Sequence, residues 1–238
     1  MLLNYFFIDG SALTAQIRVL RRQDRSFESR RLDPSRLIKH FCDALYDLGS
    51  HEFKRATFYF PKGDEVAIED YLVVPSFSKP GAVRDIHFKF CGHKLKGSAE
   101  YTTWVETSVP SKWRDRVSKS EKGVDIEICC DALKLASASR LDRLFLLAND
   151  DDFLPLCRTL KEFGANISVI HLTDFIAPNV SLVSEADSYD VVGRTALQQM
   201  FVPSAELPTG NAAETADASE EKAVAPSPES QGGPNDGE

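Results

Sequence analysis

The sequence predicts an α/β protein in which a mainly parallel sheet is covered by helices on both faces. Short apolar runs of strand length alternate with segments whose apolar residues recur every three or four positions, as on one face of a helix. The run at residues 144–148 is continuously apolar, which is typical of a strand buried on both faces of a parallel sheet. Strands separated by helices favour parallel pairing, with helices above and below the sheet.

The expected elements follow one another along the chain. Strands are expected at residues 3–8, 56–60, 86–91, 144–148 and 167–172. Asp33 and Pro34 predict a helix start, because Asp caps helices and Pro suits the first helical position. That helix is expected to continue to Leu48, with Gly49 as its stop. A shorter helix is expected at residues 65–72.

Two later helices are predicted from their apolar spacing. In residues 124–138 the apolar face consists of Ile126, Cys129, Leu133 and Ala136. In residues 153–163 it consists of Phe153, Leu156, Leu160 and Phe163, and Gly164 ends the helix. Residues 94–109 are less regular and are expected to form a β-ribbon or an inserted loop, since residues 101–105 favour strand.

Charge divides the chain into two parts. The net charge of the 238 residues is −8, and residues 203–238 contain eight acidic residues against one basic residue. This segment is rich in Ala, Glu, Pro, Ser and Gly and has no aromatic residue, so we expect a disordered acidic tail after a domain at residues 1–202. The acidity of the whole chain therefore does not argue against nucleic acid as a partner of the domain.

The composition also limits location and class. No apolar run approaches the ~20 residues of a membrane span, and no basic stretch precedes the apolar N-terminus. Five cysteines without framework spacing indicate a reducing, cytoplasmic compartment without disulfides. Cys91 and His93 have no second pair at zinc-ligand spacing, and neither a phosphate loop nor a G-x-G-x-x-G segment is present.

Carboxylates follow the predicted strands where α/β sheets bind ligands, beyond the carboxyl ends of the strands. Asp9 follows the first strand, Asp150, Asp151 and Asp152 follow the strand at residues 144–148, and Asp125 opens a helix. Such a cluster suits Mg²⁺, which prefers hard oxygen ligands and keeps several waters. Each aspartate also has an ordinary explanation as a helix cap, a turn residue or, for Asp131, a solvated ion pair with Lys134.

Three segments resemble the NYN family, in its LabA-like branch, within the PIN-like nuclease superfamily. They are Phe7-Ile8-Asp9-Gly10, then Lys122-Gly123-Val124-Asp125-Ile126 with Asp131 six residues after Asp125, and the segment at residues 148–156 with sequence ANDDDFLPL. Their order and spacing fit the family over roughly residues 3–190.

The resemblance implies a Rossmann-like three-layer α/β/α sandwich of the PIN-like type and a ribonuclease that depends on Mg²⁺ or Mn²⁺. Its catalytic, metal-binding carboxylates would be Asp9, Asp125, Asp150 and Asp152, with Asp131 as a further metal ligand. The substrate would be RNA, in single-stranded form. The family often has Asn shortly after the first Asp-Gly, where this chain has Ser11 and Ala12, and Asn149 and Asp151 replace its two usual glycines.

Two basic stretches, residues 16–39 and 84–122, flank the acidic segments in sequence. RNA phosphates are expected to contact Ser11, Lys119 and Lys122, and Tyr101, Trp104 or Trp113 to stack on bases. A solvated charged surface with buried aromatics is the alternative. Two other functions stay open: a non-catalytic RNA-binding or regulatory module on the same fold, and an adaptor that binds a protein partner through the acidic tail. A homo-oligomer is compatible with each of them.

Overall fold

The computed structural model describes residues 2–46, 51–74, 85–94, 99–112 and 121–204. Its centre is a six-stranded sheet in the order β4-β3-β1-β7-β8-β9, and every neighbouring pair is parallel. The strands are β1 (Leu2–Asp9), β3 (His51–Pro61), β4 (Ile86–Cys91), β7 (Arg143–Leu147), β8 (Asn166–His171) and β9 (Ser188–Val191). The predicted α/β class with a mainly parallel sheet is confirmed.

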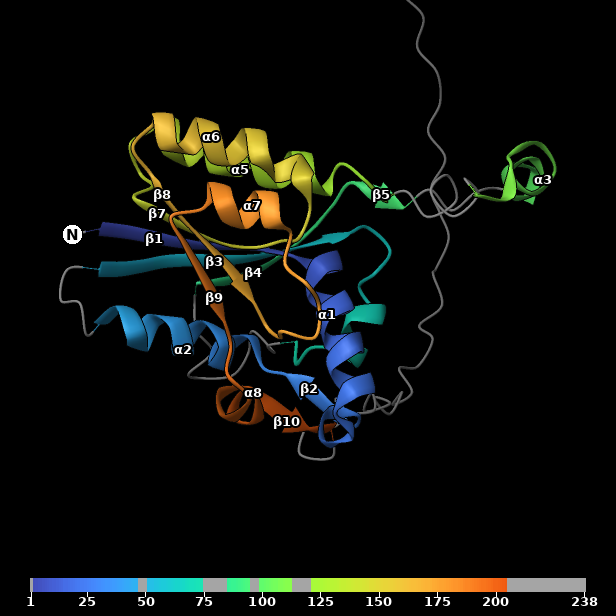
Figure 1. Cartoon of the computed structure of the whole chain (residues 1–238), viewed down its shortest axis with the longest axis horizontal. Helices are drawn as coiled ribbons and strands as arrows, with labels where there is room; N and C mark the ends of the chain where they lie inside the picture. Colours follow the sequence, from blue (N-terminus) through green and yellow to red (C-terminus); the bar gives the residue numbers. More distant parts are fainter. Residues whose placement is uncertain (1, 47–50, 75–84, 95–98, 113–120, 205–238) are drawn as a thin grey trace, which may run out of the picture. The chain divides into compact units, whose positions relative to one another are not determined.

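Helices cover both faces of this sheet, so the fold has three layers (Figure 1). One face packs against α1 (Gly10–Gln23), α2 (Pro34–Tyr46) and α8 (Arg194–Met200). The other packs against α5 (Val124–Ser137), α6 (Leu154–Glu162) and α7 (Val180–Glu185). Residues alternate along β1, so that Phe6 and Ile8 join the first core whereas Tyr5 and Phe7 join the second.

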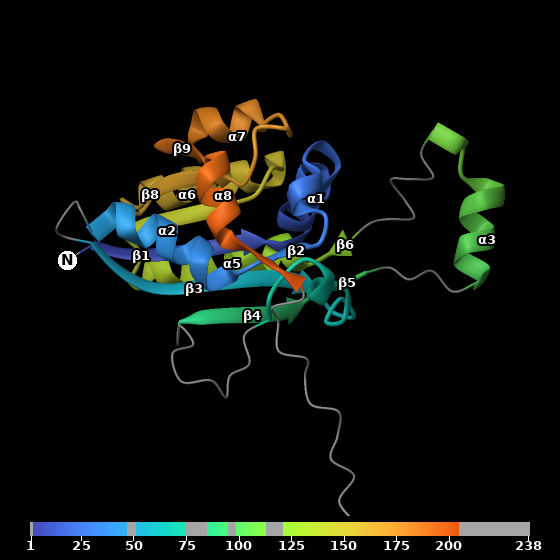
Figure 2. The same ribbon diagram turned by 90° about the horizontal axis from the view of Figure 1, so that it is seen from below.

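Short elements lie on the same side of the sheet as α1, α2 and α8 (Figure 2). β2 (Arg30–Leu32) pairs antiparallel with β10 (Phe201–Pro203), and 3-10 helices span Arg25–Phe27 and Ala67–Asp70. The Ser204 amide donates to the Ser29 carbonyl at 3.0 Å, so the described fold extends through residue 204. The chain divides into the units Met1–Leu207 and Pro208–Glu238, and the second lies outside the described residues, as does most of the predicted tail.

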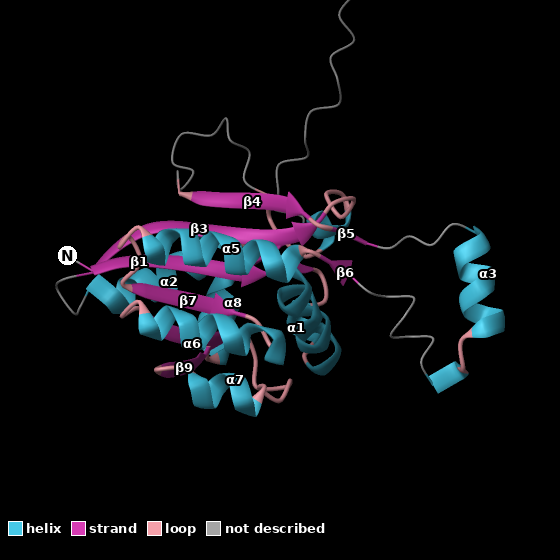
Figure 3. Cartoon of the chain, turned by 90° about the horizontal axis from the view of Figure 1, so that it is seen from above, coloured by secondary structure: helices cyan, strands magenta, loops and turns pink. Residues whose placement is uncertain are grey.

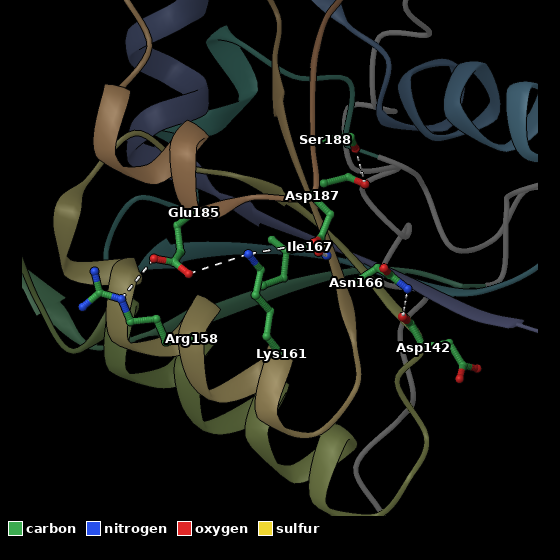
Figure 4. A network of polar contacts seen from close by, with 9 residues as sticks. Asp142, Arg158, Lys161, Asn166, Ile167, Glu185, Asp187 and Ser188 are labelled. Atoms are coloured by element: carbon green, nitrogen blue, oxygen red, sulfur yellow. Dashed lines mark hydrogen bonds and ion pairs between the residues drawn. The ribbon is translucent and has the colours of Figure 1, made fainter.

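Ion pairs connect the end of α7 with α6, and a hydrogen bond connects the residue before β9 with β8 (Figure 4). Glu185 lies 3.0 Å from Arg158 Nε and 3.6 Å from Lys161 Nζ, both on α6. Asp187 accepts a hydrogen bond from the Ile167 amide at 2.7 Å at the start of β8. These contacts align the edge strand β9 with β8.

Local signals explain the helix ends. The Ser35 amide donates to Asp33 Oδ1 at 2.8 Å before α2, so the predicted cap is confirmed, whereas Gly49 lies outside the described residues. Gly123 has φ +92° before α5 and Gly164 has φ +80° after α6, a backbone region that favours glycine. Within the described chain, no helix is long and apolar enough to cross a membrane. All five cysteines are free.

Two expected elements are wrong. The helix expected at residues 65–72 is only the 3-10 turn Ala67–Asp70, because the chain then extends to pair with β2 through the Leu32 amide and the Tyr71 carbonyl. Residues 101–105 belong to the helix α3 (Ala99–Ser108) rather than to a strand. No described strand pairs with this segment. Because β propensity mainly reflects packing against neighbouring strands, residues that favour strand do not form one here. The two strands on either side, β5 (His93–Lys94) and β6 (Glu121–Lys122), do form a short antiparallel ribbon.

One predicted helix face is shifted, and a second, which consists of Phe153, Leu156 and Leu160, is buried as predicted except for Phe163. In α5 the buried residues are Val124, Ile128, Ala132 and Ala136, whereas Ile126 is 68% exposed. The residues of α5 that face the sheet are therefore spaced four positions apart. Phe163 is 53% exposed, because it follows the last residue of α6 as the chain leaves the core.

Candidate active site

The carboxyl ends of β1 and β7 form the topological switch point of the sheet. From β1 the chain passes to β3 and β4 on one side, and from β7 it passes to β8 and β9 on the other. Ligands of open α/β sheets bind in the crevice at this point. Asp9 is the last residue of β1, and Asp150 follows the end of β7 at Leu147 by three positions. The sheet thus places these two aspartates on neighbouring strand ends.

Asp9 is held in place as the N-cap of α1. Its Oδ1 accepts a hydrogen bond from the Ser11 amide at 2.8 Å, and the residue is 8% exposed. Gly10 permits this arrangement, because a Cβ there would lie 2.2 Å from Phe60 Cδ1 and 2.5 Å from the Tyr59 carbonyl oxygen. α1 therefore starts in close contact with β3, which fixes the position of the Asp9 carboxylate.

Asp150 is a cap as well, but it is exposed. Its Oδ1 accepts from the Asp152 amide at 3.1 Å at the start of the 3-10 helix η3 (Asp151–Phe153). Asn149 joins this segment to the loop after β8. Its Nδ2 donates to the Ala177 carbonyl at 3.2 Å, and its Oδ1 accepts from the Asn179 amide at 2.6 Å.

The replacement of the two family glycines does not strain the backbone. Ser139 is the single non-glycine residue with positive φ in the described chain, so neither Asn149 nor Asp151 adopts the left-handed conformation. Asp151 is exposed.

Asp125 and Asp152 lie on two elements that contact each other, α5 and η3. Asp125 lies half-buried in the first turn of α5, and Asp152 lies exposed on η3. Burial raises the pKa of the Cys129 thiol to about 11, and the negative charges of Asp125 and Asp152 contribute in the same direction. Both carboxylates therefore lie near the N-terminal half of α5.

Asp131 has a different environment. Its Oδ2 accepts hydrogen bonds from the Tyr59 hydroxyl at 3.1 Å and from Lys89 Nζ at 2.6 Å, and Lys134 Nζ lies 3.6 Å from its Oδ1. Burial lowers the pKa of Lys89, but its hydrogen bonds to Asp131 and Glu127 outweigh that effect and raise it. Burial raises the pKa of Tyr59, and Asp131 adds to the rise. Asp131 thus takes part in a network with β3 and β4.

The donor chemistry of the edge fits a hard divalent cation, since Asp9, Asp125, Asp150 and Asp152 offer carboxylate oxygens. Among the described residues, however, no group of three or more His, Cys, Asp or Glu side chains is arranged to hold a metal ion. Mg²⁺ is commonly bound by one or two carboxylates together with waters and substrate phosphates, so a preassembled cage is not required.

The residues predicted to contact RNA are only partly described. Ser11 lies exposed in the first turn of α1, next to Asp9. Lys122 belongs to β6, where it is paired with His93, and Lys119 and Trp113 lie outside the described residues. Trp104 on α3 is 51% exposed.

Many bases of the first basic stretch serve the fold. Arg18 Nε donates to the Tyr71 hydroxyl at 2.8 Å, and the guanidinium of Arg21 donates to the carbonyls of Arg30 and Asp70. Sequence reasoning missed Gln16, whose Oε1 accepts from the Leu172 amide at 2.7 Å beneath the edge. Its signal was a polar residue on the apolar face of α1, between Leu13 and Ile17.

A parallel sheet between two helical layers, with aspartates at its switch point, places the protein among α/β proteins of the PIN-like type. The NYN domain model matches residues 6–191, and the chain belongs to the NYN family, which is part of the PIN-like nuclease superfamily. No curated protein and no solved structure matched the chain in the corresponding comparisons.

Proposed function

We propose that the protein is a metal-dependent ribonuclease that hydrolyses phosphodiester bonds of single-stranded RNA at the edge formed by Asp9, Asp125, Asp150 and Asp152. The observation that carries the proposal is the position of Asp9 and Asp150 on the neighbouring carboxyl ends of β1 and β7. NYN family members are typically ribonucleases, which is consistent with this assignment. The segments at residues 7–10 and 148–156 further favour the LabA-like branch.

The chain's own groups would orient the substrate. Asp9 is fixed by the Ser11 amide, and Asp150 by the Asp152 amide, so both carboxylates are positioned before any ligand binds. α1 and α5 both begin at this edge, and the partial positive charge of their N-termini offsets repulsion between carboxylates and phosphate. Mg²⁺ or Mn²⁺ bound there would lower the pKa of a water and neutralise charge on the scissile phosphate.

The test is cleavage of a labelled single-stranded RNA by the full chain in Mg²⁺, Mn²⁺ or EDTA. Asp9→Asn and Asp150→Asn keep a side-chain oxygen for their cap hydrogen bonds, so folding is preserved while a negative charge is lost. We expect each variant to lower the rate by about 100-fold or more, as when a group that stabilises the transition state is removed.

The matched control is Asp43→Asn, which makes the same change at an exposed residue paired with Lys39 on α2. It should cleave like the wild type. Unchanged cleavage by Asp9→Asn and Asp150→Asn, or full activity in EDTA, would contradict the proposal.

A second candidate is a non-catalytic RNA-binding module. It is favoured by the extra negative charge of Asp151 next to the site. This function predicts RNA binding that is insensitive both to EDTA and to the two substitutions, without cleavage in any metal.

A further inference from the structure

A concave site lies on the α5 side of the sheet and extends to Tyr59, the register partner of Asp9. α5 overlies β1 and β3, whereas β4 extends beyond it as the edge strand of the sheet (Figure 3). A cavity of about 530 Å³ lies between α5 and the strands β1, β3 and β4. This volume is within the range of ~300–1,000 Å³ that is usual for small-molecule sites.

The floor of the cavity is formed by side chains from neighbouring strands. Tyr5, Phe7, Thr57 and Tyr59 line it, and all four are almost fully buried. They occupy alternate positions of β1 and β3, so their side chains lie on the same face of the sheet. Such a floor suits a planar, mainly apolar group.

The rim is strongly cationic. Arg55, Lys89, Lys134 and Arg140 line the cavity together with His87, against the single carboxylate of Asp131. This excess of positive charge belongs to a chain whose net charge is −8. A concave site with one sign of charge concentrates ions of the opposite sign.

Part of this charge is not used by the fold. Lys89 is paired with Asp131 and Glu127, and Lys134 is paired with Asp131, so these two lysines are offset by two carboxylates. The side chains of Arg55, His87 and Arg140 make no hydrogen bond or ion pair with other residues of the described chain. Arg55 and Arg140 are exposed, so their guanidinium groups are available to an anion, which they can bind in bidentate fashion.

We propose that this cavity binds a nucleoside phosphate, with the phosphate at the cationic rim and the base on the floor formed by β1 and β3. A planar apolar floor next to unpaired arginines matches a ligand that joins an aromatic base to an anion. The ligand is a nucleotide of an RNA strand or a free mononucleotide. Only the RNA source rests on the proposed function.

The cavity is well placed to continue a strand that passes the acidic edge. Tyr59, on its floor, is the register partner of Asp9, and neighbouring strands lie about 4.8 Å apart. Arg55 and Tyr59 are four residues apart on β3, so the cavity extends about 13 Å along the sheet at ~3.3 Å per residue.

The test measures binding to the full chain in EDTA, so that neither cleavage nor metal binding affects the result. The probes are AMP and a short fluorescent single-stranded oligoribonucleotide. The double variant Arg55→Ala/Arg140→Ala removes two unpaired cations from the rim. The matched control, Arg22→Ala/Arg25→Ala, removes the same charge from exposed residues outside the cavity.

We expect the rim variant to weaken binding about tenfold and to reduce the salt dependence of the oligonucleotide affinity by about 1 in log–log slope. The control should leave both unchanged. Weakened binding of AMP identifies a free nucleotide as a ligand, and weakened binding of the oligonucleotide alone identifies RNA.

The proposal is wrong if the rim variant binds both probes like the wild type, or if both double variants weaken binding equally. In NMR spectra of the wild type, titration with a probe that binds should also shift the amide resonances of Thr57 and His87. Failure of the nuclease assay leaves this result unaffected, because binding is measured without metal.

Discussion

The Tyr59 hydroxyl donates a hydrogen bond to Asp131 Oδ2 at 3.1 Å and so joins the C-terminal part of β3 to α5. Tyr59 is 1% exposed, and the hydroxyl therefore depends on this acceptor rather than on water. Asp131 also pairs with Lys89 of β4, so one carboxylate connects three elements. This structural role differs from the metal-ligand role that the family resemblance suggests for Asp131.

A double-mutant cycle tests the structural role. Asp131→Ala should lower the free energy of unfolding by about 1–3 kcal/mol, because it leaves the buried Tyr59 hydroxyl without an acceptor. Tyr59→Phe in the Asp131→Ala background should cost little more, since both partners are then absent. Urea unfolding of the wild type, the two single variants and the double variant gives the coupling free energy between Tyr59 and Asp131. Strictly additive losses would contradict the prediction.

Gly10 provides a second prediction. Gly10→Ala places a Cβ 2.5 Å from the Tyr59 carbonyl oxygen, so α1 or β3 has to shift, and we expect a loss of about 2 kcal/mol, as for overpacked sites. Gly193→Ala is the matched control, because a Cβ added there would have no atom within 4 Å and its φ is −67°. Thermal unfolding compares them, and equal melting temperatures would refute the close-contact explanation.

The strands were the most predictable part of the fold. Those at residues 86–91 and 167–172 are found within one residue. For the second, burial on both faces leaves an apolar run with few alternatives. Helix faces were less predictable. Ile126 fits an apolar spacing of three and four but is exposed, since the tilt of α5 on the sheet depends on packing that no local spacing specifies.

The candidate site was predictable where it depends on strand ends. Asp9 and Asp150 were placed at the carboxyl edge from sequence alone, and the sheet order makes their strands neighbours. The surroundings of Asp131 were not predictable, because Tyr59 and Lys89 are 72 and 42 residues away in sequence. The Asn149 contacts with Ala177 and Asn179 also span the chain from one loop to another.

Divalent metal should stabilise the folded protein if the acidic edge binds it. A metal at tenfold its Kd adds about 1.4 kcal/mol by mass action, so the wild-type melting temperature should rise in Mg²⁺ or Mn²⁺ relative to EDTA. The rise should be absent in Asp9→Asn and Asp150→Asn and present in Asp43→Asn. An equal rise in all four proteins would show that metal binds elsewhere.

The buried imidazole of His171 predicts how stability depends on pH. His171 is 1% exposed and neither ring nitrogen makes a hydrogen bond in the described structure. Burial lowers its pKa, and the nearby Ala148 backbone offsets this effect only in part. Below about pH 6.5 the unfolded chain therefore binds a proton that the folded chain does not, and this contribution destabilises the fold as pH falls.

His171→Leu removes this proton-binding group from its buried site. Between pH 7.5 and 5, the free energy of unfolding of the wild type should fall more steeply than that of the variant, by at most about 1.4 kcal/mol per pH unit for one proton. Urea unfolding at a series of pH values measures both slopes. Parallel curves for the two proteins would mean that His171 titrates alike in the folded and unfolded chains, and that its burial does not control stability in acid.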